Sequence, residues 1–146
     1  MCSRNNVRLL LPVDVVVADR LDNNANTEIV AIEKVPKDKT IADIGPKTIE
    51  SFIKELMESK TIFWNGPVGV YEIPKFAEGT IAMAKILAGL NATTIIGGGS
   101  TAEVVNELGL AEKMTFVSTG GGASLQFLGG EALPGVEALL DKGSKL

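Results

Sequence analysis

The chain has 146 residues, of which 45% are hydrophobic and 22% are charged, and it carries a net charge of −4. The acidic balance argues against a nucleic-acid partner, which would require basic stripes. No apolar run approaches the roughly 20 residues of a membrane-spanning helix, so we expect no membrane partner either. The absence of His removes the commonest general base and metal ligand. The one cysteine, Cys2, favours a reducing, cytoplasmic setting.

The first part of the chain predicts short strands and one amphipathic helix. An apolar run over 7–18, interrupted by Pro12, precedes an edge strand over 29–33 and a further strand over 40–44. A helix then begins at Pro46, because proline suits the first helical turn. Apolar residues follow at helical spacing, and they form a stripe of Ile49, Phe52, Ile53, Leu56 and Met57.

The remainder alternates strand and helix. Strands are expected over 61–64, 93–96 and 114–117, and helices over 76–87, 100–108, 123–128 and 136–140. Strands separated by helical segments are typical of parallel sheets covered on both faces. We therefore predict an α/β fold, a three-layer α/β/α sandwich around a mainly parallel, Rossmann-like sheet.

Two glycine triplets, Gly97–Gly99 and Gly120–Gly122, each lie between a predicted strand and a predicted helix. Such turns bring backbone N–H groups and a helix N-terminus up to an anion, usually a phosphate. A third loop follows Trp64. Ligands of open α/β sheets bind outside the carboxyl ends of the strands, so the three loops should line one crevice.

Other interpretations of the first triplet stay open at this point. Residues 97–102 match G-x-G-x-x-A, the dinucleotide-binding pattern, but no carboxylate follows in 116–119, where that pattern requires one. No Lys follows the glycines, so the Walker A pattern is excluded. Ser100 and Glu103 fit a capping box, which would use the same amides as a phosphate. A tight turn without a ligand also explains the glycines.

The loop after Trp64 offers two polar side chains, Asn65 and Glu72. Glycines and Pro67 make its backbone narrow and stiff, and Val68, Val70 and Tyr71 offer an apolar face to a base. Glu72 can accept hydrogen bonds from ribose hydroxyls. Alternatively, Trp64 and Tyr71 belong to the core and Glu72 is a solvated loop charge.

Several stretches resemble phosphoglycerate kinase, in the same order and spacing. They are FWNGPVGVYE (63–72), IIGGGSTAEVV (95–105) and VSTGGGASLQFLGGEALPGV (117–136), with LLLPVDVVVAD (9–19) and IADIGPKTIE (41–50) upstream. The resemblance covers nearly the whole chain. It implies that residues 1–142 are part of a C-terminal nucleotide-binding domain. Residues 143–146, of sequence GSKL, are typical of a tail left by cloning.

The resemblance also implies a function, that of a magnesium-dependent glycolytic kinase. This kinase transfers a phosphoryl group between 1,3-bisphosphoglycerate and ADP, giving 3-phosphoglycerate and ATP. The oxygens between which the phosphoryl group moves belong to a carboxylate and a phosphate, and both are already ionised at neutral pH. The reaction therefore does not require His as a general base. The nucleotide-binding residues carried over by motif are Asn65, Pro67, Val70, Glu72, Gly97, Gly98, Gly99, Ser100 and Thr101. Gly120 and Gly121 would present N–H groups to the phosphoryl group in flight.

Two departures from the family limit this expectation. Ser100 stands where many members carry Asp, so no metal ligand is assigned and the Mg-ATP or Mg-ADP site is expected to be incomplete. The N-terminal domain that binds 3-phosphoglycerate has no counterpart here, so we expect a partial domain, inactive alone. Its unpaired sheet edges favour a homo-oligomer. The alternatives are a dinucleotide-binding piece of an oxidoreductase and a non-catalytic, self-associating remnant.

Overall fold

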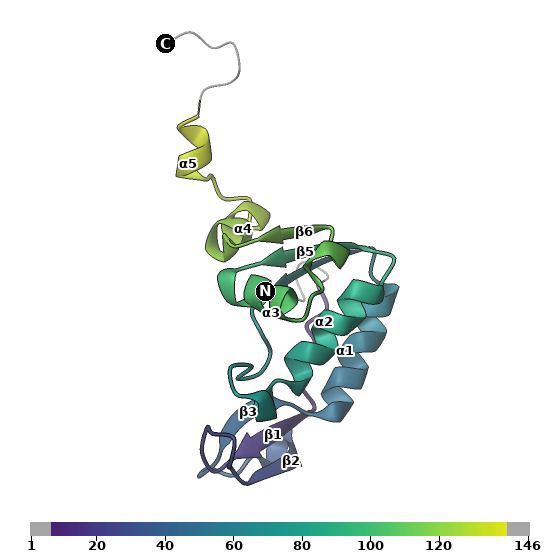
Figure 1. The fold of residues 1–146 in the computed structure, drawn as a ribbon, viewed down its shortest axis with the longest axis vertical. Helices are drawn as coiled ribbons and strands as arrows, with labels where there is room; N and C mark the ends of the chain where they lie inside the picture. The colour runs from purple at the N-terminus through teal and green to yellow at the C-terminus, as the bar shows by residue number, and fades with distance from the viewer. Residues whose placement is uncertain (1–6, 140–146) are drawn as a thin grey trace.

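The computed structural model describes residues 7–139, which contain two three-stranded sheets (Figure 1). The strand order is β2-β1-β3 in the first sheet and β4-β5-β6 in the second. The predicted α/β class is therefore confirmed. The expectations for Cys2 and for the tail over 143–146 lie outside the described residues.

The first sheet is antiparallel and separate from the parallel one. β1 (Asp14–Ala18) lies between β2 (Thr27–Ala31) and β3 (Thr40–Ile44). The sequence interpretation had placed these strands in one mainly parallel sheet. The connection over 19–26 explains the difference, because parallel neighbours need a crossover of about a dozen residues or more, whereas antiparallel strands do not.

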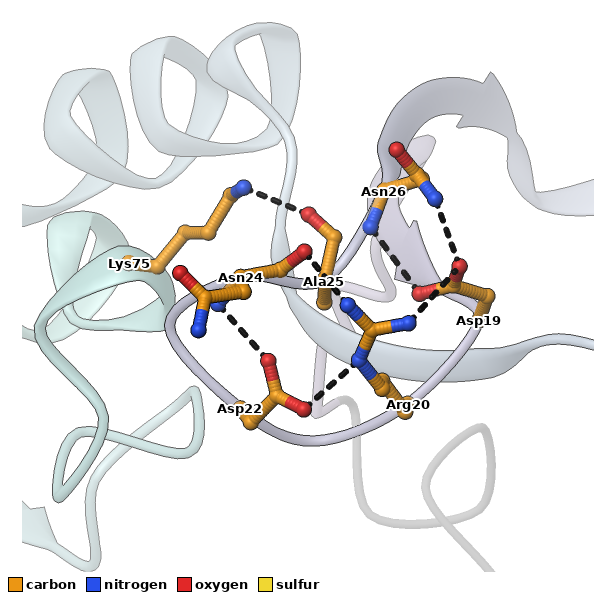
Figure 2. A network of polar contacts seen from close by, with 7 residues as sticks. All are labelled: Asp19, Arg20, Asp22, Asn24, Ala25, Asn26 and Lys75. Atoms are coloured by element: carbon orange, nitrogen blue, oxygen red, sulfur yellow. Dashed lines mark hydrogen bonds and ion pairs between the residues drawn. The ribbon is translucent and has the colours of Figure 1, made fainter.

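That connection forms a closed polar loop (Figure 2). The Asp19 carboxylate accepts the backbone N–H of Asn26 at 2.9 Å and its side-chain amide at 2.8 Å. Arg20 donates to the Asp22 carboxylate at 2.6 Å and to the Asn24 carbonyl at 2.8 Å. The loop thereby satisfies its own polar groups while it turns β1 back into β2.

The second sheet is parallel and consists of β4 (Thr61–Asn65), β5 (Thr93–Gly97) and β6 (Phe116–Ser118). Its helices are α1 (Pro46–Glu58), α2 (Glu78–Gly89), α3 (Gly99–Glu107) and α4 (Gly121–Leu128). The short helix α5 (Pro134–Glu137) lies beyond α4 at the far end of the molecule (Figure 1). Single 3-10 turns occupy η2 (Ile32–Lys34), η3 (Pro74–Phe76) and η4 (Ala111–Lys113).

The main core lies between one face of the parallel sheet and the helices α1, α2 and α3. Its buried members include Ile62, Trp64, Met83, Leu87, Ile96 and Val105. Alternation along the strands points Phe63 and Ile95 to the opposite face, where they border a hollow together with Phe127 of α4. Helices thus flank both faces of this sheet, as the three-layer prediction requires.

The helix predicted from Pro46 is confirmed, with Gly45 as its N-cap. Ile49, Phe52, Ile53 and Leu56 pack against the core as the stripe predicted, whereas Met57 is 64% exposed. Within residues 7–139 no helix is both long and apolar enough to cross a membrane.

Candidate functional site

The loops that follow β4, β5 and β6 meet at Asn65, Gly98 and Gly121. A β-carbon on Gly121 would lie 2.8 Å from the Gly98 Cα and 3.1 Å from Asn65 Oδ1. A β-carbon on Gly98 would lie 2.8 Å from the same Asn65 oxygen, and Gly98 has a φ of +97°, which favours glycine. The three loops therefore converge as predicted, and side chains at either glycine would fill the space between them.

Both helices begin inside the glycine triplets rather than after them. Gly98 is the N-cap of α3 and Gly120 is the N-cap of α4, and within residues 7–139 no side chain caps either N-terminus. The capping box predicted for Ser100 and Glu103 is therefore wrong, because the helix starts two residues earlier than that motif requires. The first-turn N–H groups of α3 have no acceptors within the helix, because the helix begins there. Such free N–H groups can donate hydrogen bonds to an anion.

The nucleotide-binding residues predicted in the first triplet divide into exposed and buried groups. Gly99 and Ser100 are exposed at the start of α3, whereas Gly97 and Thr101 are buried. The Thr101 hydroxyl accepts the Gly66 N–H at 2.7 Å, so it joins α3 to the loop after β4. A β-carbon on Gly97 would lie 2.5 Å from the Phe63 ring. The buried pair therefore supports the site from beneath.

The second triplet is tied to the end of β6. The Gly120 N–H donates to Ser118 Oγ at 3.1 Å, and the Gly121 N–H donates to the Thr119 carbonyl at 3.1 Å. The Gly98 N–H donates to the Ser118 carbonyl at 2.9 Å, which links the two triplets. An anion that used the Gly120 and Gly121 amides would have to replace their present acceptors.

The loop after β4 packs against the antiparallel sheet. Val70 donates its backbone N–H to the Ala42 carbonyl at 2.9 Å and contacts a small core of Ala18, Ala25, Ala42 and Phe76. Pro67 is half-buried and Glu72 is exposed. The adjacent Tyr71 hydroxyl donates to Glu103 of α3 at 2.9 Å, so this loop is linked to α3 at two points.

Negative charge dominates the rim near Tyr71. The hydrogen bond to Glu103 raises the pKa of Tyr71 to about 12, and the carboxylates of Glu72 and Glu107 add to this shift. Among the described residues no three Asp, Glu, Cys or His side chains are grouped to hold a metal ion. The backbone of the site suits a phosphate, whereas its side chains provide no complete metal site.

Sequence reasoning missed the supporting contacts. It did not anticipate Ser118 as the acceptor for Gly120, the hydroxyl link from Thr101, or the buried Asp43 beside this loop. Only Asp43 carried a signal, since a carboxylate inside the apolar strand 40–44 is unusual unless it is hydrogen-bonded.

Comparison with protein families gives a match to the model for phosphoglycerate kinase over residues 1–131. The chain is 52% identical over 136 residues to a phosphoglycerate kinase of Herpetosiphon aurantiacus, covering 93% of this chain and 34% of that protein. It is 54% identical over 139 residues to the chloroplastic phosphoglycerate kinase of Volvox carteri, covering 93% and 30%.

Solved structures give the same result. A phosphoglycerate kinase from Coxiella burnetii matches with a TM-score of 0.85 at 42% identity, covering 92% of this chain and 35% of that one. The phosphoglycerate kinase from Pyrococcus horikoshii matches with a TM-score of 0.76 at 34% identity, covering 93% and 33%. The chain therefore spans about a third of the length of the relatives it matches.

Proposed function

The chain belongs to the phosphoglycerate kinase family, and we propose that it forms part of the site at which an adenine nucleotide binds. The observation that carries this proposal is the convergence of Gly98 and Gly121 with Asn65, at the N-termini of α3 and α4. Helix N-termini without side-chain caps attract phosphate. Because the chain belongs to this family, the alternative of a dinucleotide-binding piece of an oxidoreductase is dropped.

In this proposal the nucleotide lies across the three loops. Its phosphates bind the segment Gly97–Thr101, chiefly through the exposed start of α3, with Asn65 beside them. Glu72 accepts hydrogen bonds from the ribose, and Pro67 and Val70 border the adenine. Gly120 and Gly121 turn their N–H groups from Ser118 and Thr119 to the phosphoryl group being transferred.

The proposed reaction is that of the family, between 1,3-bisphosphoglycerate and ADP, giving 3-phosphoglycerate and ATP. One bond from the transferred phosphorus to a carboxylate oxygen breaks, and one to the terminal oxygen of ADP forms. Neither oxygen needs deprotonation at neutral pH, so the reaction depends on positioning and charge stabilisation. Each helix N-terminus stabilises a negative charge by only about 0.3–1 kcal/mol. This is too little to neutralise the nucleotide phosphates beside the acidic rim, so the nucleotide has to bring Mg²⁺ with it.

We further propose that this chain does not catalyse the reaction by itself. It spans about a third of its relatives, and the 3-phosphoglycerate site is expected in the part of those relatives that it does not match. A coupled assay with ATP and 3-phosphoglycerate should give no turnover above buffer. Turnover that persists after further purification and is lost in Gly98→Ala would refute this proposal.

The proposed partners are an adenine nucleotide and a second copy of the chain, in the cytoplasm, with no nucleic acid or membrane. Among residues 7–139, β4 and β6 lie at the outer edges of their sheet. Phe116 is 61% exposed and Phe127 is 68% exposed, beside a hollow of about 370 Å³. Open edges and apolar surface of this kind favour self-association.

Calorimetry tests nucleotide binding directly. MgADP should bind the chain, and NAD should not, because the dinucleotide pattern lacks its carboxylate in 116–119. Gly89→Ala on α2 serves as the control variant, because it lies outside the three loops and no atom lies within 4 Å of the added carbon. Gly98→Ala should weaken binding. Failure of MgADP to bind at millimolar concentration would support the non-catalytic remnant instead.

A further inference from the structure

A buried carboxylate, Asp43 of β3, lies outside the residues proposed to touch the nucleotide. It is only 2% exposed. Its Oδ1 accepts the Ile44 N–H at 2.8 Å, and its Oδ2 accepts the Gly79 N–H at 2.8 Å in the first turn of α2. The carboxylate thus joins the antiparallel sheet to the helix that follows the loop after β4.

The same carboxylate is enclosed by the backbone of that loop. A β-carbon on Gly69 would lie 2.4 Å from Asp43 Oδ1, and a β-carbon on Gly79 would also lie 2.4 Å from it. Because neither glycine has a side chain, the carboxylate of Asp43 has room to lie between them. Asp43 fixes how closely the loop and α2 approach β3.

Neighbouring contacts hold the loop on both sides of this point. The Val70 N–H donates to the Ala42 carbonyl at 2.9 Å, one residue away from Asp43 on β3. Further along, Phe76 is fully buried and Lys75 Nζ donates to the Ala25 carbonyl at 2.5 Å (Figure 2). The segment between these anchors contains Glu72, which the proposed function assigns to the ribose.

A second buried carboxylate, Asp14 of β1, provides a matched comparison. It is 5% exposed and accepts the N–H groups of Lys47 at 3.1 Å and Thr48 at 2.8 Å, at the start of α1. A β-carbon on Gly45 would lie 2.3 Å from its carboxyl carbon. Asp14 therefore resembles Asp43 in type, burial and packing, but the helix that it holds is α1, which precedes β4, whereas α2 directly follows the loop after β4.

We propose that Asp43 is a positioning residue for the adenine-nucleotide site, which holds Gly69 and so places Val70 and Glu72 for binding. This proposal rests on the proposed function for its effect on the nucleotide. Its effect on the loop does not depend on that function. The two parts are therefore measured separately.

The principal variant is Asp43→Asn, with Asp14→Asn as its control. An amide has one acceptor oxygen, so either Ile44 or Gly79 loses its partner. Hydrogen exchange of the Val70 and Ile73 amides should accelerate about tenfold in Asp43→Asn and stay unchanged in Asp14→Asn, at denaturant concentrations that equalise their global stability. The Kd for MgADP should rise about tenfold in Asp43→Asn alone.

Each outcome bears on one claim. If the wild-type chain does not bind MgADP, the proposed function fails, and hydrogen exchange alone decides the role of Asp43. Equal exchange in both variants, or an equal change in Kd, would overturn the proposal. Should Asp43→Asn not fold, Gly79→Ala displaces the carboxylate without removing it, and it should loosen the same two amides. Gly89→Ala is its control on α2, where nothing lies within 4 Å.

Discussion

Gly121 lies against Gly98 so closely that a β-carbon on Gly121 would stand 2.8 Å from the Gly98 Cα. The turns after β5 and β6 therefore pack backbone against backbone. Their N–H groups can then face one ligand from two helices. Because this contact has no room for a side chain, it is also the part of the site most sensitive to a single added carbon.

Gly121→Ala should destabilise the chain by about 1–3 kcal/mol, since the backbone of Gly98 would have to move. Gly122→Ala is the matched control in the same triplet, because nothing lies within 4 Å of the added carbon. Alanine there should be neutral or slightly stabilising in the helix. Urea unfolding followed by the fluorescence of Trp64, the one tryptophan, measures both. Equal effects in the two variants would contradict the close contact.

The elements of the parallel sheet could be predicted from the sequence because each depends on local pattern. Apolar runs bounded by glycine predicted β4 and β5, and the helical stripe with Pro46 predicted α1. The separation into two sheets was not predicted. It follows from pairing between strands, and only the length of the 19–26 connection hinted at it.

The site could be predicted only as a meeting of loops. Strand ends on one edge placed Asn65 and both triplets together, but the motif resemblance could not show that Thr101 is buried beneath Gly66. The capping box failed because Gly98, with a φ of +97°, is the N-cap of α3, so the helix begins before Ser100. Contacts such as that of Gly120 with Ser118 depend on side-chain placement that no spacing encodes.

Glu103→Gln should lower the pKa of Tyr71 from about 12 towards its usual value of 10.0. The charged acceptor stabilises the protonated hydroxyl, whereas the amide carries no charge and offers only a weaker, neutral acceptor. Because the chain has one tyrosine, the absorbance of tyrosinate at alkaline pH reports this group alone. Glu107→Gln, which removes only a nearby charge, should shift the pKa less. An unchanged titration in Glu103→Gln would show that this link between the loop and α3 does not form.

Asp14→Asn should reduce the free energy of unfolding at pH 7 by about 2 kcal/mol, through the loss of charged hydrogen bonds at the start of α1. Burial by itself would raise the pKa of Asp14, but the hydrogen bonds from Thr48 and Lys47 outweigh it, and the pKa lies below 3.8. The stability from this group is therefore present above pH 3.8 and lost as the pH falls through the lowered pKa. Urea unfolding between pH 2 and pH 7 should show that the difference in free energy of unfolding between variant and wild type becomes smaller as the pH falls.

Asp43→Asn should show the opposite dependence on pH. Burial raises the pKa of Asp43 above 3.8, in part opposed by the Gly79 and Ile44 amides, and the charge of Glu78 raises it further. Its stabilising contribution is therefore greatest below pH 3.8 and falls as the pH rises through the raised pKa. In the same unfolding series, the difference in free energy of unfolding between this variant and wild type should become smaller as the pH rises towards 7. A gap that widens towards neutral pH would contradict the raised pKa.

Phe127→Ser should weaken self-association if the hollow beside α4 is where two copies meet. Phe127 lines that hollow and is 68% exposed. Met57→Ser is the control, because Met57 is similarly exposed but lies on α1. Light scattering after size exclusion should find an oligomer for wild type and Met57→Ser, and a shift to monomer for Phe127→Ser. A wild-type chain that is monomeric at every concentration would refute self-association.

The central claim is that an adenine nucleotide binds where the two glycine triplets meet. Its most direct test is a titration of the ¹⁵N-labelled chain with MgADP, followed by amide chemical shifts. The largest changes should fall on Gly98–Thr101 and Gly120–Gly122, with smaller ones at Asn65 and Glu72. Changes confined to other segments, or none at millimolar MgADP, would contradict the account.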